Sequence, residues 1–183
     1  MARVGVIDSL DARSESVMKK MQGNDNDIPS GYYAAQLMIR AKSYFSAFEI
    51  LSSAALEKHP HPCLYLLSHS LELSLKSFLA SRGVNLKDLQ LKYRHNFRLI
   101  FNDCLNFGFP SVDGLSEIID GFDNMGEKQF LRFPVDKELI IHNFDSLGAT
   151  VKAIITHIES AILIAALDGN SEYRSLHKNK EKF

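Results

Sequence analysis

A polar stripe near the middle of the chain holds side chains that could move protons or bind anions. Glu72 lies three residues after His69 and four residues before Lys76, so a helix would place all three on one face. Histidine titrates near neutral pH and suits acid–base catalysis, and a lysine ammonium can hold a phosphate group. The same side chains can instead form an internal polar network that fixes how the helices pack. The spacing alone leaves both interpretations open.

The residues around this stripe predict the helix that would position it. Apolar side chains recur at three- and four-residue intervals over residues 64–80, and Gly83 is expected to end the helix. Leucines also flank Glu72 on both sides, so we expect the Glu72 carboxylate and the Lys76 ammonium to be partly buried. A buried charge must be paired, and the pattern therefore predicts a partner from another helix.

Further helices are predicted from the same periodicity. They cover about residues 31–57, 95–107, 112–124 and 145–168. An extended apolar segment over residues 130–135 precedes the last helix, and no repeat or long strand pattern is visible. We therefore predict an all-α, antiparallel up-and-down bundle of about five helices over residues 30–168. Residues 1–29 are expected to form an N-terminal arm, and residues 169–183 a polar C-terminal tail.

The composition is that of an ordinary globular domain, and it limits the function classes. The chain has 183 residues and a net charge of −1, which excludes a surface that is basic throughout, as many nucleic-acid-binding proteins have. Any contact with RNA would have to be local. We expect no signal peptide and no membrane-spanning segment, and hence a soluble cytoplasmic protein.

Cysteine and histidine do not form a metal motif in this sequence. His59 and His61 both precede prolines, which favour an extended turn, and no matching second pair of ligands lies nearby in the sequence. Cys63 and Cys104 each fall in an apolar helical pattern, so we expect them to be small core residues in a reducing compartment. We predict no metal and no other cofactor.

The last predicted helix has a wider apolar surface than one face of a bundle needs. Its apolar stripe is broadened by Ile155, Leu163 and Ile164. We therefore expect a homodimer that forms through this helix. A different protein partner would cover the same surface if the chain has a purely structural role.

Several motifs together resemble those of the HEPN-like helical-bundle proteins. Glu72 and Lys76 form a Glu-x-x-x-Lys pair at mid-helix, Gly83 follows at the helix end, and His95-Asn96-Phe97 opens the next helix. Arg132-Phe133-Pro134 is similar to an Arg-aromatic-Pro element that precedes the last helix in such chains. The resemblance covers about residues 31–167 and implies a dimeric bundle of four or five antiparallel helices. Many members are metal-independent ribonucleases of toxin–antitoxin or other defence systems, and others are non-catalytic partners of nucleotidyltransferases.

One part of the family pattern is missing from this chain. Catalytic members carry an arginine that is followed, after four to six residues, by a histidine, and no arginine of this sequence has a histidine at that interval. Nine residues separate Arg132 from His142, and Arg94 is adjacent to His95. The motif supplies charge stabilisation and proton transfer for attack by a ribose 2′-hydroxyl, so its absence argues against ribonuclease activity.

Two functional hypotheses follow from these residues and from the resemblance. The leading hypothesis is a HEPN-like dimeric interaction module that associates with RNA or a nucleotide, is not catalytic, and belongs to a defence or toxin–antitoxin type system. Its internal polar network would consist of His69, Glu72, Lys76, His95 and Arg132. The alternative is a divergent metal-independent ribonuclease, in which Lys76 and Arg132 hold a phosphate and His95 is the candidate catalytic residue. His69 or Glu72 would assist in proton transfer.

Overall fold

The chain folds into an all-α bundle, as the sequence predicts. The computed structural model describes residues 28–110, 112–127 and 144–178, and these contain six helices and no strand. The helices are α2 (Ser30–Ala55), α3 (Pro60–Ser81), α4 (Leu86–Leu91), α5 (Phe97–Asn106), α6 (Leu115–Glu127) and α7 (Phe144–Lys178). Most of the expected N-terminal arm, the expected extended segment and Arg132 lie outside the described residues.

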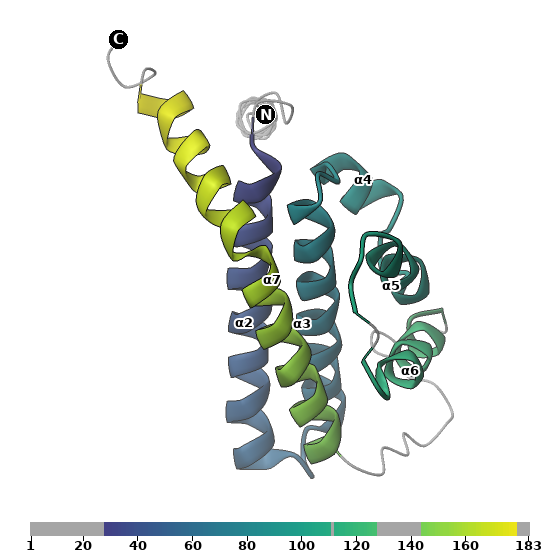
Figure 1. Cartoon of the computed structure of the whole chain (residues 1–183). Helices are drawn as coiled ribbons and strands as arrows, with labels where there is room; N and C mark the ends of the chain where they lie inside the picture. The colour runs from purple at the N-terminus through teal and green to yellow at the C-terminus, as the bar shows by residue number, and fades with distance from the viewer. Residues whose placement is uncertain (1–27, 111, 128–143, 179–183) are drawn as a thin grey trace, which may run out of the picture.

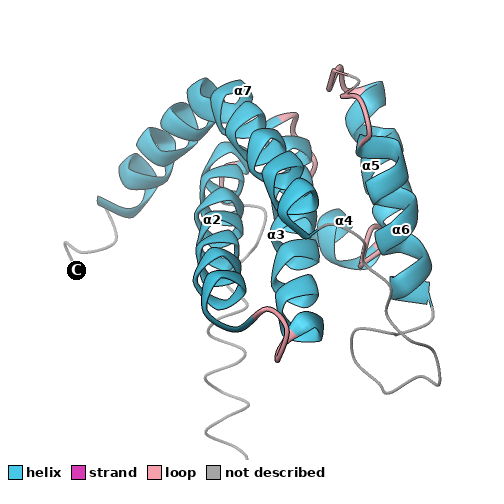
Figure 2. Ribbon diagram, turned by 90° about the horizontal axis from the view of Figure 1, so that it is seen from below, coloured by secondary structure: helices cyan, strands magenta, loops and turns pink. Residues whose placement is uncertain are grey.

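Helix α3 is the central element of the bundle. Helices α2 and α7 pack along one side of it, and α4, α5 and α6 form a smaller group on the other side (Figure 1). The view from below shows the same separation, with α3 between α2 and the α5–α6 pair (Figure 2). Of the 22 residues of α3, 14 are buried. This helix therefore presents apolar or small side chains in more than one direction.

Small side chains allow α2 and α3 to approach each other closely. The Ser70 hydroxyl donates to the Ala41 carbonyl oxygen at 2.8 Å, and the Ser77 hydroxyl donates to the Ala34 carbonyl oxygen at 2.7 Å. The two serines are seven residues apart, as are the two alanines, so the contact repeats after about two helical turns. Each buried hydroxyl is satisfied by the backbone of the neighbouring helix, which keeps the cost of burying it low.

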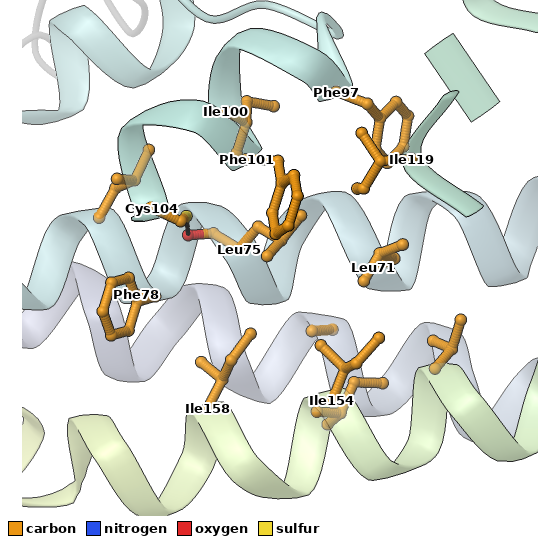
Figure 3. Packing of buried hydrophobic residues seen from close by; sticks show 14 of the residues in the cluster. Leu71, Leu75, Phe78, Phe97, Ile100, Phe101, Cys104, Ile119, Ile154 and Ile158 are labelled. Atoms are coloured by element: carbon orange, nitrogen blue, oxygen red, sulfur yellow. Dashed lines mark hydrogen bonds between the residues drawn. The ribbon is translucent and has the colours of Figure 1, made fainter. Parts of the chain in front are cut away.

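The apolar core lies on both sides of α3. Figure 3 shows Leu71, Leu75 and Phe78 of α3 between residues of α7, such as Ile158, and residues of α5. Cys104 belongs to this core, and its Sγ lies 3.5 Å from the Leu75 carbonyl oxygen. Cys63 and Cys104 are both buried and free, which confirms that they are core residues.

Polar contacts at the start of α5 join it to α6. Asn96 caps α5, because its side-chain oxygen accepts the Leu99 N–H at 2.7 Å. Asp123 of α6 accepts the Arg98 N–H at 3.3 Å, and Asp120 accepts from the Arg98 guanidinium at 2.7 Å. The first turn of α5 is thus held by its own cap and by two carboxylates of α6.

Two local features differ from the predictions. The sequence predicts an extended turn at the prolines that follow His59 and His61, but α3 already begins at Pro60. Proline is tolerated in a first helical turn because the N–H that it lacks has no acceptor there. Helix α4 is not predicted, since Leu89 is its only buried residue and six residues are too few to show a periodicity.

Gly169 packs two helices together instead of ending one. The sequence predicts that the last helix stops near this glycine, but α7 continues beyond it. A Cβ atom at Gly169 would lie 2.2 Å from the Tyr32 nitrogen, and one at Gly31 would lie 1.9 Å from the Ala165 carbonyl oxygen. The backbones of α2 and α7 therefore touch at this crossing. The stacked rings of Tyr32 and Tyr173, with centroids 4.0 Å apart, extend the contact.

We expect Gly169→Ala to destabilise the fold by about 1–3 kcal/mol, because α2 leaves no space for a methyl group. Gly121→Ala in α6 is the matched control. Apart from the helix's own nearby backbone, no atom of the described residues lies within 4 Å of a Cβ at Gly121, so alanine should be neutral there or stabilise the helix by up to about 1 kcal/mol. Urea unfolding followed by circular dichroism measures both changes, and an equally small effect of the two would contradict the close crossing.

Candidate functional site

The centre of the polar stripe is the Glu72 carboxylate. Only 5% of the Glu72 side chain is exposed. Lys76 Nζ lies 2.7 Å from Oε1, and His95 Nδ1 lies 3.0 Å from Oε2 and 3.2 Å from Oε1. His69 Nδ1 is 3.8 Å from Oε2. The predicted residues His69, Lys76 and His95 therefore converge on one carboxylate, and His95 reaches it from the loop before α5.

Lys76 links this carboxylate to the main chain of the same loop. Its side chain is 10% exposed, and its ammonium donates both to Glu72 and to the Arg94 carbonyl oxygen. Burying an ammonium is unfavourable unless a counter-charge and further acceptors satisfy it. Glu72 supplies the charge and the Arg94 carbonyl supplies a second acceptor. Lys76 thus holds the loop between α4 and α5 against α3.

The backbone of this loop is strained at Arg94. Its φ of 42° is the only positive φ at a non-glycine position in the described part of the chain. The left-handed conformation costs an L-residue about 1–2 kcal/mol and persists where the surrounding structure holds it. Here the hydrogen bond from Lys76 and the contact between Glu72 and His95 hold two successive residues of the loop.

Glu72 is ionised at neutral pH. Burial by itself raises the pKa of this carboxyl group, but hydrogen bonding by His69, the positive charge of Lys76 and the hydrogen bonds from His95 and Lys76 lower it. The net result is a pKa of about 2, well below the ordinary value of 4.5. The carboxylate is therefore a fixed negative charge at neutral pH and is poorly suited to exchange protons with a substrate.

The exposed border of the site is formed by aromatic and basic side chains. His69 is 22% exposed and His95 is 55% exposed. The Tyr44 ring meets the His69 ring edge-on, with centroids 4.4 Å apart, and Tyr65 stacks on His69 at 5.7 Å. Arg94, which directly precedes His95 in the loop, is exposed as well.

The geometry distinguishes between the two roles that the sequence leaves open for these side chains, namely proton transfer or anion binding, and structural support. The Glu72–His95 contact is a carboxylate–imidazole pair, which orients the histidine ring. Lys76 faces inward and its ammonium is engaged by Glu72 and the loop, so the arrangement does not favour its predicted role in phosphate binding. That role remains a prediction, as does the role of Arg132, which lies outside the described residues.

Sequence patterns do not identify Arg94, Tyr44 and Tyr65 as members of the site. The partner of Lys76 is a main-chain carbonyl, which every residue type provides, so no residue pattern reveals it. The available signal is local charge, since residues 92–98 contain three basic side chains and a histidine but no acid.

The described residues give no support to a metal site or to a reactive cysteine thiol. Among the described residues, no three His, Cys, Asp or Glu side chains form a group that could hold a metal ion. Burial raises the pKa of the Cys63 and Cys104 thiols, so both are protonated at neutral pH.

Comparisons with known proteins do not assign a family or a function to this site. No family model, curated protein or solved structure matches the chain. The HEPN-like resemblance of the sequence stays a prediction.

The stability of the fold should depend on pH through Glu72. Because its pKa is about 2 in the folded protein and its ordinary value is 4.5, ionised Glu72 stabilises the fold above this ordinary value and loses that contribution as the pH falls toward 2. We expect the difference in unfolding free energy between the wild type and Glu72→Gln to be about 2 kcal/mol smaller near pH 3 than near pH 7. Urea unfolding measures this difference, and a value that does not change with pH would contradict the assignment.

Lys76→Met should cost about 3 kcal/mol of stability, because it leaves the buried Glu72 carboxylate without its counter-charge. Lys152→Met is the matched control. Lys152 also forms an ion pair, at 2.8 Å with Glu49, but these side chains are 63% and 47% exposed. Loss of an exposed pair costs less than about 1 kcal/mol. Similar urea midpoints for the two variants would show that Lys76 does not hold the loop.

Proposed function

We propose that the protein is a HEPN-like, self-associating interaction module that contacts RNA or a nucleotide without cutting it. The main support is an apolar surface on α2 and α7 that is exposed in the described part of the chain. Further support comes from the polar site, in which the buried charges serve the fold. The assignment to a defence or toxin–antitoxin type system rests on the sequence resemblance alone.

The α2/α7 surface consists of four large apolar residues, Ile39, Leu163, Ile164 and Leu167. Their exposed fractions are 58%, 54%, 77% and 61%, respectively. The groove between the two helices continues this surface with further apolar side chains, among them Ala35, Met38, Ile162 and Ala166. A continuous apolar surface of this kind is typical of an interaction site.

The charges beside the groove favour a second copy of the chain as the partner. Lys42 of α2 and Glu159 of α7 form a 2.7 Å ion pair in the groove wall, and both side chains are about half exposed. In a two-fold dimer a surface meets its own copy, so an apolar strip that carries one acid and one base is self-complementary. The homodimer that the sequence predicts would form here.

Helix α7 also meets the length and composition criteria for a membrane-spanning helix, with 33% of its most apolar window buried. Core helices meet the same criteria. The buried part of α7 includes Val151, Ile154 and Ile158, which belong to the core that the helix shares with α2 and α3. We therefore assign its exposed apolar part to the dimer, and membrane binding is a separate outcome of the test below.

The arrangement of the long helices supports the HEPN-like assignment. Residues 56–59 join α2 to α3, and the two helices pack side by side along much of their length (Figure 1). So short a connection between neighbours is typical of an antiparallel up-and-down bundle. The Glu-x-x-x-Lys pair of the motif also lies beside His95, as the resemblance implies.

The polar site supports a role without catalysis. The pKa of Glu72 is about 2, and the Lys76 ammonium donates a hydrogen bond to the Arg94 carbonyl oxygen of the loop. Two groups that the ribonuclease alternative needs therefore have structural roles. Of the proposed catalytic and phosphate-binding residues, His95 is the one described at the surface. Lys76, which the ribonuclease alternative needs to stabilise the charge of the phosphoryl transition state, is therefore held by the fold and does not accompany His95 at the surface.

Sedimentation equilibrium should show a homodimer for the wild type. The double change Leu163→Glu, Leu167→Glu should give a folded monomer, because it places charges in the centre of the apolar surface. Leu91→Glu on α4, where Leu91 is 60% exposed, is the matched control and should remain dimeric. A monomeric wild type, or a dimer that the double change leaves intact, would contradict the proposal. A wild type that is monomeric and floats with neutral lipid vesicles would assign the surface to a membrane.

Purified protein should leave single-stranded RNA intact, both with added divalent metal and with a chelator. The reason is that the Glu72 carboxylate, with a pKa of about 2, and the Lys76 ammonium, which donates to Glu72 and to the Arg94 carbonyl oxygen, both serve the fold and do not assist His95 in the reaction. Gel electrophoresis of a labelled RNA checks this. Cleavage that His95→Ala abolishes would overturn the proposal and favour the ribonuclease that uses His95, Arg132 and Lys76.

A further inference from the structure

We propose that Arg94 and His95 form a binding site for a phosphate group of single-stranded RNA, and that Glu72 and Lys76 hold this site in place from below. The inference rests on the RNA association proposed above and assigns it to named side chains. It adds Arg94, to which the sequence motifs give no role, and it assigns Lys76 to support of the loop.

The backbone at Arg94 is the first observation. Its φ of 42° is a conformation that glycine adopts without strain and that asparagine adopts more readily than arginine. The turn by itself therefore gives no reason for an arginine at this position. The arginine side chain is exposed, so it does not contribute to the core either. A role of the guanidinium at the surface accounts for a residue type that the turn disfavours.

The support beneath the loop is the second observation. Lys76 donates to the Arg94 carbonyl oxygen, and the Glu72 carboxylate lies 3.0 Å from Nδ1 of the next residue, His95. Both supporting groups are nearly buried charges of the central helix. They hold successive residues of the loop in one conformation, which lowers the entropy that a ligand must remove when it binds.

The pattern of charge compensation is the third observation. Lys92 pairs with Asp103 at 2.9 Å, and Arg98 pairs with Asp120 at 2.7 Å. Between them, the Arg94 guanidinium has no hydrogen bond or ion pair to any residue that the structure describes. Among the residues described, Arg94 is therefore the cation of this basic segment that no carboxylate compensates, in a chain whose net charge is −1.

The neighbouring side chains indicate the class of ligand. A guanidinium matches two oxygens of a phosphate group, and the adjacent imidazole adds a second polar contact. Tyr65 is 37% exposed and stacks on His69, so it offers an aromatic face to an unpaired base. His69 and His95 approach the same oxygen of Glu72, at 3.8 and 3.0 Å, which places this aromatic border next to the loop. Each nucleotide of single-stranded RNA offers such a phosphate together with a base that is free to stack.

Fluorescence polarisation with a short labelled single-stranded RNA tests the site. Arg94→Gly removes the guanidinium and suits the left-handed backbone, so the variant should melt at or above the temperature of the wild type while it binds RNA about tenfold more weakly. The slope of log K against log salt concentration should fall by about 0.7, which corresponds to one lost phosphate contact on a single strand. Lys87→Gln, which removes an exposed charge from α4, should change the affinity less than about twofold.

Arg94→Lys separates a binding role from a structural one. It keeps the charge on the same backbone but loses the two-donor geometry of the guanidinium, so it should bind RNA more tightly than Arg94→Gly and more weakly than the wild type, with the salt dependence of the wild type. Unchanged binding by Arg94→Gly would overturn the site and leave the RNA association intact, whereas a wild type that does not bind the RNA would overturn both. Displacement of the RNA by inorganic phosphate as effectively as by uridine monophosphate would overturn the assignment to RNA.

Discussion

The structure depends on one pair of opposite charges inside its central helix. Glu72 and Lys76 are nearly buried in α3, with side chains 5% and 10% exposed, and their charged atoms are 2.7 Å apart. A buried ion pair adds little net stability compared with apolar residues of similar size, because both charges must leave water. Its remaining hydrogen bonds, however, must go to defined partners. Here they go to His95 and to the Arg94 carbonyl, and they determine where the loop before α5 lies.

Helix α3 packs its two sides by different physical means. Toward α2, serines and alanines bring the backbones together, and the glycines at the crossing of α2 and α7 continue this close packing. Toward α5, the polar pair and large apolar residues set the spacing. The first side builds the layer whose outer surface is the α2/α7 surface, and the second side places Arg94 and His95 at the protein surface. Both proposed interaction sites thus follow from how α3 is packed.

The helices with long apolar periodicity could be predicted from the sequence, and those without it could not. The heptad-like pattern of α3 and the broad stripe of α7 were sufficient, whereas α4 buries only Leu89 and shows no period. The end of α7 was misplaced because Gly169 has the residue type of a helix terminus but serves as a contact between helices. Residue type does not reveal which of these uses applies, since that depends on what packs against the glycine.

The side chains of the candidate site could be predicted from the sequence, but the main-chain carbonyl of Arg94 could not. Glu72, Lys76 and His95 could be grouped from helical spacing and from the resemblance, and the structure brings them together. Their burial could be inferred only in part from the flanking leucines. The Arg94 carbonyl and the strained φ at that residue belong to the backbone, which the residue types do not encode.

The most direct test of the central role of this pair is a double-mutant cycle of Glu72→Gln and Lys76→Met, measured by urea unfolding near neutral pH. The cycle isolates the free energy with which the two side chains depend on each other from the effects of each change alone. A buried, mutually dependent pair predicts a coupling free energy of about 2–3 kcal/mol. A coupling within about 0.5 kcal/mol of zero would show that the two charges act independently, and would contradict the account of the site as a network that the fold depends on.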